Sequence, residues 1–267
     1  MPFVSTNGIR LAYERAGTGE PVLLIMGQAA GGIVWTMDQV PALTRAGYEA
    51  IIFDNRGVPP SDVPPGDYSL ADLVADTAGL IEALGIGPCR LVATSLGAFV
   101  ATELATSRPD LVTSCVLMAL RSRADAFRRA LDAGENVLIR AGVQLPPDYE
   151  APISVLQMLS PATLNDDTAV PMWLDIYQMS AARRAVANGQ DAIDVTSDRR
   201  EALRAVPVPC RVIAFSDDLV CPPHLVAETA QAIPDCDYVE IDSCGHLGYL
   251  ERPDEVNSAI IEFLEKN

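Results

Sequence analysis

The chain has 267 residues, of which 49% are hydrophobic and 21% are charged, a balance typical of a globular protein rather than a disordered chain. Its formal net charge of −17 argues against binding to nucleic acid or to anionic membranes, since both require a basic face. No apolar run approaches the roughly 20 residues of a transmembrane helix, and no signal-peptide pattern is visible, so we expect a cytoplasmic protein.

The first elements form a predicted β-hairpin, and buried strands follow it. Asn7-Gly8, between residues 3–5 and 9–13, is typical of the two-residue turn that joins antiparallel strands. Apolar runs without polar alternation then recur, at residues 22–26, 50–53, 90–93, 112–118, 210–215 and 238–241. Such runs fit strands that are buried on both faces of a parallel sheet.

Helical patterns alternate with these strands, at residues 70–84, 96–107, 223–233 and 253–265. The alternation predicts the α/β class, with a doubly wound, mostly parallel sheet. Residues 121–197 interrupt it, because they contain no convincing strand and read as helices with breaks at prolines. The segment is too long for a loop, so we expect a helical cap inserted into an α/β core of residues 1–120 and 198–267.

A tight turn between a strand and a helix carries the first candidate catalytic residue. Ser95 follows the run 90–93 and precedes the helix 96–107, with the small residues Ala93 and Gly97 two positions to either side. A strained turn of this kind needs small neighbours, and it lifts the serine hydroxyl above the sheet at a helix N-terminus. The pattern indicates a nucleophile, and the alternative is a serine that only caps the helix.

A histidine and two aspartates follow the last two predicted strands. His246 lies in a loop after the final strand, and Asp217 and Asp218 follow the strand before it. Functional groups of open α/β folds gather at the carboxyl ends of the strands, so these side chains can meet Ser95. The alternatives are a packed or surface loop histidine and aspartates that cap turns. The only other histidine, His224, is expected at the surface.

The glycine-rich turn after the first buried strand can offer backbone N–H groups to an oxyanion. Residues 26–32 read Met-Gly-Gln-Ala-Ala-Gly-Gly. A phosphate-binding loop would need a G-x-G-x-x-G or G-x-x-x-x-G-K pattern, and this turn has neither. A metal site is not expected either, because the six cysteines form no C-x-x-C pair and there are only two histidines.

Several segments together resemble the α/β-hydrolase family, and the resemblance covers essentially the whole chain. The turn at Ser95 is similar to G-x-S-x-G, with Ala93 in place of the first glycine. The other matching segments are residues 53–62, similar to D-x-R-G-x-G-x-S with Pro59 for the second glycine; residues 218–222, similar to D-x-x-x-P; residues 245–253, similar to G-H…P; and residues 26–28, with Met26 at the usual histidine.

The resemblance implies a capped serine hydrolase with Ser95 as the nucleophile. His246 would act as general base and then as general acid, and Asp218 would orient His246. The backbone N–H groups of Gln28 and Leu96 would form the oxyanion hole. The implied reaction is hydrolysis of an ester, lactone or thioester, and no metal or organic cofactor is implied.

Three other functions remain open on this fold. A cofactor-free non-hydrolytic enzyme would keep the same serine and histidine, whether a perhydrolase or haloperoxidase type, a C–C hydrolase, or a lyase or cyclase of natural-product biosynthesis. An epoxide hydrolase or dehalogenase is disfavoured, since those enzymes carry a carboxylate where Ser95 stands. A non-catalytic ligand receptor would keep the site without turning over an acyl ester.

We expect the partner to be a small, largely apolar substrate, and the sequence leaves the oligomeric state open. Trp173 and Tyr177 lie four residues apart and so on one helical face, and Trp35 lies near the glycine-rich turn. Because ligand pockets are mostly apolar, we expect these three side chains to contact the substrate, and the alternative is core packing. The near absence of lysine and the diverged turn at Ser95 favour a substrate from secondary metabolism.

Overall fold

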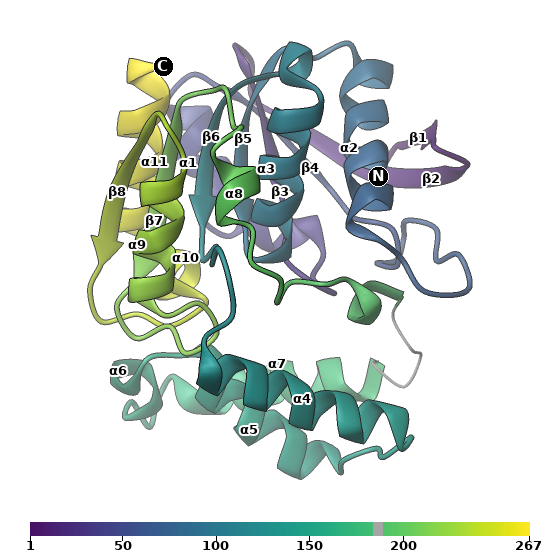
Figure 1. Ribbon diagram of the computed structural model, residues 1–267, viewed down its shortest axis with the longest axis vertical. Coiled ribbons are helices and arrows are strands. Elements are labelled where there is room, and N and C mark those ends of the chain that lie inside the picture. The colour runs from purple at the N-terminus through teal and green to yellow at the C-terminus, as the bar shows by residue number, and fades with distance from the viewer. Residues whose placement is uncertain (184–188) are drawn as a thin grey trace.

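The computed structural model describes residues 1–183 and 189–267, and an eight-stranded β-sheet lies at its centre (Figure 1). The strand order is β1-β2-β4-β3-β5-β6-β7-β8, in which β2 is antiparallel to β1 and β4 and all other pairs are parallel. The strands are β1 (Phe3–Thr6), β2 (Ile9–Ala16), β3 (Pro21–Ile25), β4 (Glu49–Phe53), β5 (Cys89–Thr94), β6 (Val112–Met118), β7 (Cys210–Phe215) and β8 (Cys236–Ile241). The predicted mostly parallel α/β sheet is confirmed.

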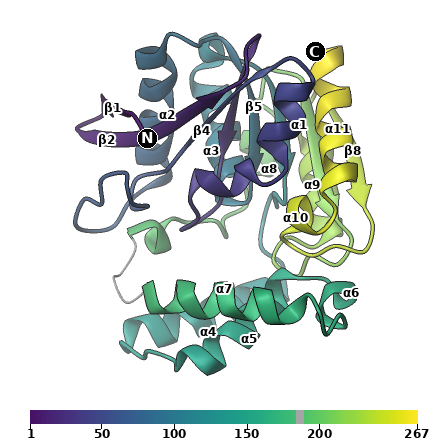
Figure 2. The ribbon, with the colours of Figure 1, turned by 180° about the vertical axis from the view of Figure 1, so that it is seen from behind.

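Helices cover both faces of this sheet (Figures 1 and 2). One face carries α2 (Leu70–Leu84), α3 (Leu96–Ser107) and α9 (Pro223–Ala232), and the other carries α1 (Gln39–Arg45) and α11 (Pro253–Lys266). The shorter helices are η1 (Gly32–Thr36), η2 (Pro109–Leu111), η3 (Gly189–Ala192), α8 (Arg200–Leu203) and α10 (Gly248–Glu251). Among the described residues, no helix is both long and apolar enough to span a bilayer.

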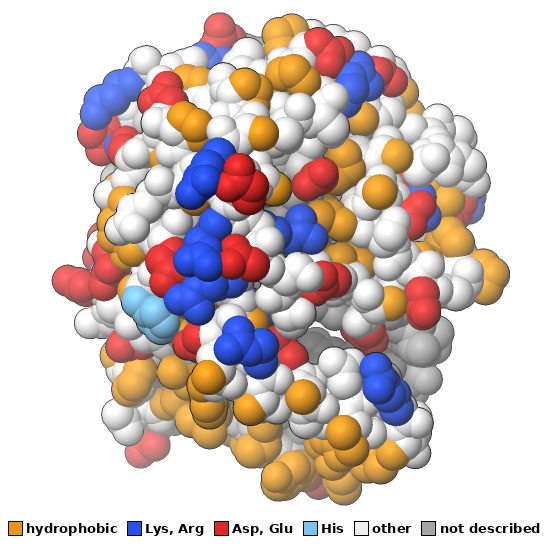
Figure 3. All heavy atoms as spheres, viewed as in Figure 1, with side chains coloured by type: hydrophobic (Ala, Val, Ile, Leu, Met, Phe, Trp, Pro, Cys, Tyr) orange, Lys and Arg blue, Asp and Glu red, His pale blue; other side chains and the backbone are white. Residues whose placement is uncertain are grey.

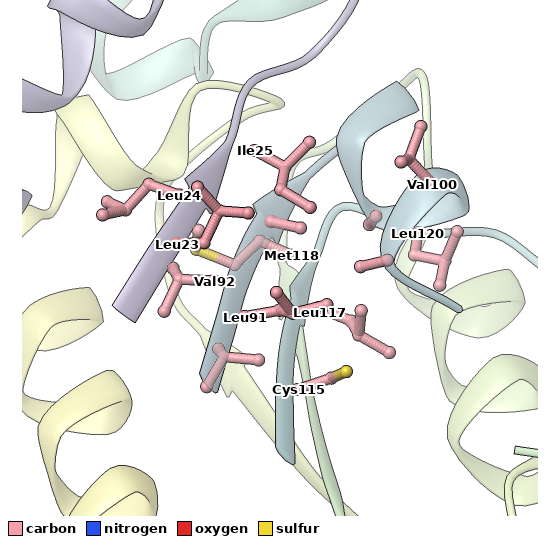
Figure 4. Close-up of a cluster of buried hydrophobic side chains, with 14 of the residues drawn as sticks. Leu23, Leu24, Ile25, Leu91, Val92, Val100, Cys115, Leu117, Met118 and Leu120 are labelled. Carbon is pink, nitrogen blue, oxygen red and sulfur yellow. The ribbon is translucent and has the colours of Figure 1, made fainter. Parts of the chain in front are cut away.

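The central strands are buried on both faces, as their unbroken apolar runs predict. Leu23, Leu91 and Cys115 lie in register on adjacent strands, and none has exposed surface. Figure 4 shows them among other side chains of β3, β5 and β6. Burying one large apolar side chain stabilises the folded state by about 1.5–3 kcal/mol. The central strands are therefore stable, and they fix the positions of the loops that follow them.

A layer of helices lies beyond the carboxyl ends of the parallel strands (Figures 1 and 2). This helical layer comprises α4 (Ala126–Arg140), α5 (Pro147–Met158), α6 (Pro161–Leu164) and α7 (Val170–Arg183). The sequence predicts helix breaks at Pro146-Pro147, Pro161 and Pro171. Pro146 directly precedes α5, and Pro147, Pro161 and Pro171 stand in the first turn of a helix. There the missing N–H of proline has no helical partner to lose. The described residues between β6 and β7 contain no strand.

The helical layer exposes many apolar side chains, which gather in the lower part of Figure 3. The exposed ones are Phe127, Val137, Leu138, Val143, Tyr149, Ile153, Leu156, Met172, Ile176 and Met179. The layer's own buried cluster, which we call the layer cluster, consists of Val155, Leu159 and Trp173 in the described part of the chain.

Candidate active site

Ser95 occupies the turn between β5 and α3, and its backbone is strained. Its φ of 52° and ψ of −124° lie in a region that residues with a side chain rarely adopt. Its N–H donates to the carbonyl of Met118 at 3.0 Å, which ties the turn to the end of β6. At Gly97, a Cβ would lie 2.3 Å from the carbonyl oxygen of Ile25. The need for glycine two positions after Ser95 therefore has a steric cause.

Three side chains at the carboxyl ends of β5, β7 and β8 form a chain of hydrogen bonds. Nε2 of His246 lies 3.0 Å from Oγ of Ser95, and Nδ1 of His246 lies 2.8 Å from Oδ2 of Asp218. His246 is 3% exposed and Asp218 is 2% exposed, whereas Ser95 is partly exposed. The serine is therefore open to a substrate, and the two groups behind it interact where water screens them little.

Backbone donors fix the carboxylate of Asp218. Its Oδ1 accepts the N–H groups of Val220 and Cys221, each at 2.7 Å. Oδ2 is left to accept Nδ1–H of His246, so the lone pair of Nε2 faces the serine hydroxyl. No hydrogen bond to the neighbouring carboxylate of Asp217 occurs in the part of the chain that the structure describes. The geometry thus distinguishes the two aspartates.

The glycine-rich turn lies against Ser95. A Cβ on Gly27 would be 3.2 Å from Cβ of Ser95 and 3.8 Å from its Oγ. Within residues 1–183 and 189–267, the backbone N–H groups of Gln28 and Leu96 have no hydrogen-bond acceptor. Both N–H groups are therefore available for the oxyanion hole expected from the sequence, and that role stays a prediction.

Side chains from two other segments hold this turn in place. Nδ2 of Asn55 donates to the carbonyl of Met26 at 3.2 Å. Oε1 of Gln190 accepts the N–H of Ala29 at 2.8 Å, while Nε2 of Gln190 donates to the carbonyl of Arg56 at 2.7 Å. Ala29 has a φ of 56°, which alanine seldom adopts without such support. Nothing in the sequence singles out Gln190, because an isolated glutamine belongs to no motif.

The three aromatic side chains expected to contact the substrate lie in two places. Trp35 has no exposed surface and packs on Tyr249 with 5.0 Å between ring centroids, so a substrate would reach it only by displacing part of the main core. Trp173 belongs to the layer cluster, and Tyr177 packs against that cluster. Leu247 packs there too. The layer cluster thus contacts the loop of His246 through Leu247.

The ligand atoms of Asp218, Cys221 and His246 lie within 4.8 Å of one another, close enough to hold a metal ion. Asp218 and His246 already bond to each other, and Asp218 also accepts two backbone N–H groups. Cys221 is 2% exposed, and burial raises the pKa of its thiol to about 12. This group fits the hydrogen-bond chain to Ser95 better than it fits a metal site.

Comparison with known proteins identifies a family and a similar chain. Residues 22–259 match the family model described as "Alpha/beta hydrolase family". A Mycobacterium tuberculosis protein named "Putative non-heme bromoperoxidase BpoC" is 43% identical over 257 residues, which are 96% of this chain and 97% of that protein. Its crystal structure matches with a TM-score of 0.87 and 42% identity and covers 96% of both chains.

Two other proteins are similar at lower identity. "Putative carbamate hydrolase RutD" of Azorhizobium caulinodans is 27% identical over 266 residues, 98% of each chain. The structure of a thermophilic esterase from Thermogutta terrifontis matches with a TM-score of 0.80 and 28% identity, and it covers 99% of this chain and 96% of that one. The names of these proteins describe different reactions, so the fold is shared more widely than the chemistry.

Proposed function

This chain belongs to the alpha/beta hydrolase family, and we propose that it is a serine hydrolase of esters, lactones or thioesters of a small apolar molecule. The observation that carries the proposal is the contact from Oγ of Ser95 to His246, at 3.0 Å, and from His246 to Asp218, at 2.8 Å. A serine hydroxyl is a poor nucleophile, and a base within hydrogen-bond reach activates it.

In the first half of the reaction, Oγ of Ser95 attacks the substrate carbonyl while Nε2 of His246 takes the hydroxyl proton. Asp218 holds the imidazole in the required tautomer and stabilises the imidazolium. The N–H groups of Gln28 and Leu96 donate to the tetrahedral oxyanion, and loss of one such donor typically costs about 3 kcal/mol. The intermediate collapses as His246 protonates the leaving alcohol or thiol, and the acyl group stays on Ser95.

In the second half, water replaces the leaving group. His246 takes a proton from the water, whose oxygen attacks the acyl carbon, and the same N–H groups stabilise the second oxyanion. The bond to Oγ of Ser95 then breaks, and His246 returns the proton to that oxygen. The products are a carboxylic acid and the alcohol or thiol, and every proton moves through Nε2.

The substrate class follows from the surroundings of the histidine loop. Tyr177 and Leu247, the residue after His246, both pack against the layer cluster that contains Trp173. This supports an apolar surface for an acyl or leaving group that enters from the helical layer. The net charge of −17 disfavours anionic substrates at long range. We therefore propose uncharged esters, lactones or thioesters, and carbamates are included because a relative is named a carbamate hydrolase.

The test combines labelling with hydrolysis of p-nitrophenyl esters. A fluorophosphonate probe should modify Ser95, and Ser95→Ala should fold normally but lose hydrolysis by about 10³-fold or more. His246→Ala should cripple acylation, whereas His224→Ala should not, because the His224 side chain is 61% exposed and pairs with Asp125 at 3.5 Å. Probe modification of a different residue would contradict the proposal.

A second candidate is a cofactor-free perhydrolase, and the 43% identity to a protein named a bromoperoxidase favours it. Hydrogen peroxide would replace water and attack the acyl group on Ser95, which releases a peracid that oxidises bromide in solution. Bromination of a dye in acetate, peroxide and bromide measures this reaction. A larger kcat/KM for perhydrolysis than for ester hydrolysis selects the second candidate, and the reverse order selects the first.

A further inference from the structure

The carboxylate of Glu251 joins the histidine loop to the helical layer. It accepts hydrogen bonds from the N–H and hydroxyl groups of Ser160, the hydroxyl of Thr163 and the N–H of Gly245. In the described ranges, no arginine or lysine pairs with this carboxylate. Its charge is therefore stabilised by neutral donors that come from two different parts of the fold.

The two oxygens of Glu251 share one donor, the N–H of Ser160, at 3.0 Å from Oε1 and 3.3 Å from Oε2, and otherwise have different partners. Oε1 accepts the Ser160 N–H at 3.0 Å, the Ser160 hydroxyl at 2.7 Å and the Thr163 hydroxyl at 2.5 Å, all at the start of α6. Oε2 accepts the N–H of Gly245, the residue before His246, at 2.6 Å. One side chain thus connects the helical layer to the backbone that carries the histidine.

The chain on both sides of His246 lies against the end of α5. A Cβ on Gly245 would be 2.7 Å from the carbonyl oxygen of Met158 and 2.6 Å from the carbonyl carbon of Leu159. On the other side, the N–H of Leu247 donates to the same carbonyl of Met158 at 3.2 Å. The position of the histidine backbone therefore depends on how the helical layer is seated.

We infer that Glu251 is a positioning residue, which sets the distance from Nε2 of His246 to Oγ of Ser95 by clamping Gly245 to Ser160 and Thr163. The inference deepens the proposed serine hydrolase and rests on it. A displacement of about 1 Å in such a contact can lower the rate about 100-fold. Through the same clamp, a shift of the helical layer would change the position of His246 and so its ability to take the proton of Ser95.

The variant Glu251→Gln tests the clamp, because an amide has one acceptor oxygen in place of two, and its NH2 group then faces an N–H donor on one side and weakens the clamp there. Its matched control is Glu255→Gln, which removes one exposed carboxylate from α11. We expect Glu251→Gln to lower kcat for an activated ester about 10- to 100-fold, with a much smaller change in KM. The control should match the unchanged chain. Equal kcat values for the two variants would overturn the inference.

Ser160→Ala tests the other end of the clamp, because it removes the hydroxyl that donates to Glu251. It also keeps the inference testable if Glu251→Gln fails to fold. We expect it to lower kcat as well, and the double variant should lose less than the product of the two single losses, because both act through one contact. Losses that multiply would mean that Ser160 and Glu251 act independently, and this would contradict the clamp.

Amide hydrogen exchange separates failure of this inference from failure of the proposed function. Absence of both acyl turnover and Ser95 labelling in the unchanged chain would refute the hydrolase. The clamp would still be measurable, because Glu251→Gln should speed exchange in peptides that cover residues 243–248, and Glu255→Gln should not. Unchanged exchange in Glu251→Gln would refute the clamp whatever the activity.

Discussion

Gly27 and Ser95 stand two residues beyond Ile25 and Ala93, which are paired positions on the adjacent parallel strands β3 and β5. The register of this one strand pair therefore brings the glycine-rich turn against the nucleophile. A Cβ added to Gly27 would lie 3.2 Å from Cβ of Ser95, which is tighter than ordinary contact. The space above the serine hydroxyl is kept open by the absence of a side chain at Gly27.

Gly27→Ala should therefore lower activity more than stability. The new methyl group would press on Ser95 and on the path of the attacked carbonyl, so we expect kcat to fall about tenfold or more while the unfolding midpoint changes little. Steady-state kinetics and urea unfolding of the same samples measure both quantities. A variant with unchanged kcat would show that Ser95 can move aside without consequence.

Gly97→Ala should show the opposite balance, a loss of stability. Its Cβ would lie 2.3 Å from the carbonyl oxygen of Ile25, so α3 must shift away from β3. Overpacking of this kind typically costs about 1–3 kcal/mol. Gly134→Ala in α4 is the control, because nothing lies within 4 Å of its Cβ position, and alanine should stabilise this helix by up to about 1 kcal/mol. Urea unfolding that ranks the two variants the other way would contradict the steric argument.

Asp218→Asn should lower kcat by about 10⁴-fold, since an amide favours the wrong imidazole tautomer. Asp217→Asn should have a much smaller effect, because only Asp218 contacts His246, at 2.8 Å. Both variants remove one negative charge at adjacent positions, so the comparison isolates the contact. The reverse ranking would mean that the structure assigns the wrong aspartate.

The mostly parallel sheet could be predicted from the sequence, because the signals of buried strands and of the turn at Ser95 are local. Continuous apolar runs identify the central strands, and the D-x-x-x-P spacing favours Asp218 over Asp217. The expectation that residues 238–241 are buried on both faces is wrong, because β8 is an edge strand in which Tyr238 is 38% exposed. The helix expected at residues 96–107 has the bounds of α3, Leu96–Ser107. Sequence reasoning did not identify α1, whose short apolar pattern contains a proline.

The supporting contacts could not be predicted, since they join residues that are far apart in the chain. Gln190 meets Ala29 across 161 positions, and Glu251 meets Ser160 across 91. Neither residue has a periodic pattern or a spacing that would single it out. The orientation of a side chain is also hard to predict from sequence. The sequence places Trp35 near the glycine-rich turn, but its ring points into the core, and this direction depends on tertiary packing.

Cys89 and Cys221 should resist alkylation until the protein unfolds. Burial raises the pKa of each thiol to about 12, so the thiolate fraction at pH 8 is about 0.01%. We expect iodoacetamide to modify neither residue in the native protein and both in urea, as measured by peptide mass spectrometry. Rapid native-state modification of Cys221 would contradict this prediction, because it would show that the thiol is accessible.

Replacement of the two tryptophans should separate packing from substrate contact. Trp35→Ala removes a fully buried ring from the main core, a change that typically costs about 3–5 kcal/mol. We expect the unfolding midpoint to fall while KM of the remaining folded enzyme stays the same. Trp173→Ala removes a ring from the layer cluster, which meets Leu247 beside His246.

For Trp173→Ala we expect a smaller loss of stability, together with a raised KM and an altered preference for acyl chain length. The reason is that the layer cluster is small and adjoins the histidine loop, so part of the lost surface would be surface offered to the acyl group. Met172→Ala is the control, since its side chain is 53% exposed on the same helix. KM values for esters of increasing chain length and urea unfolding are the measurements. A large loss of stability with unchanged kinetics would mean that Trp173 only packs the helical layer.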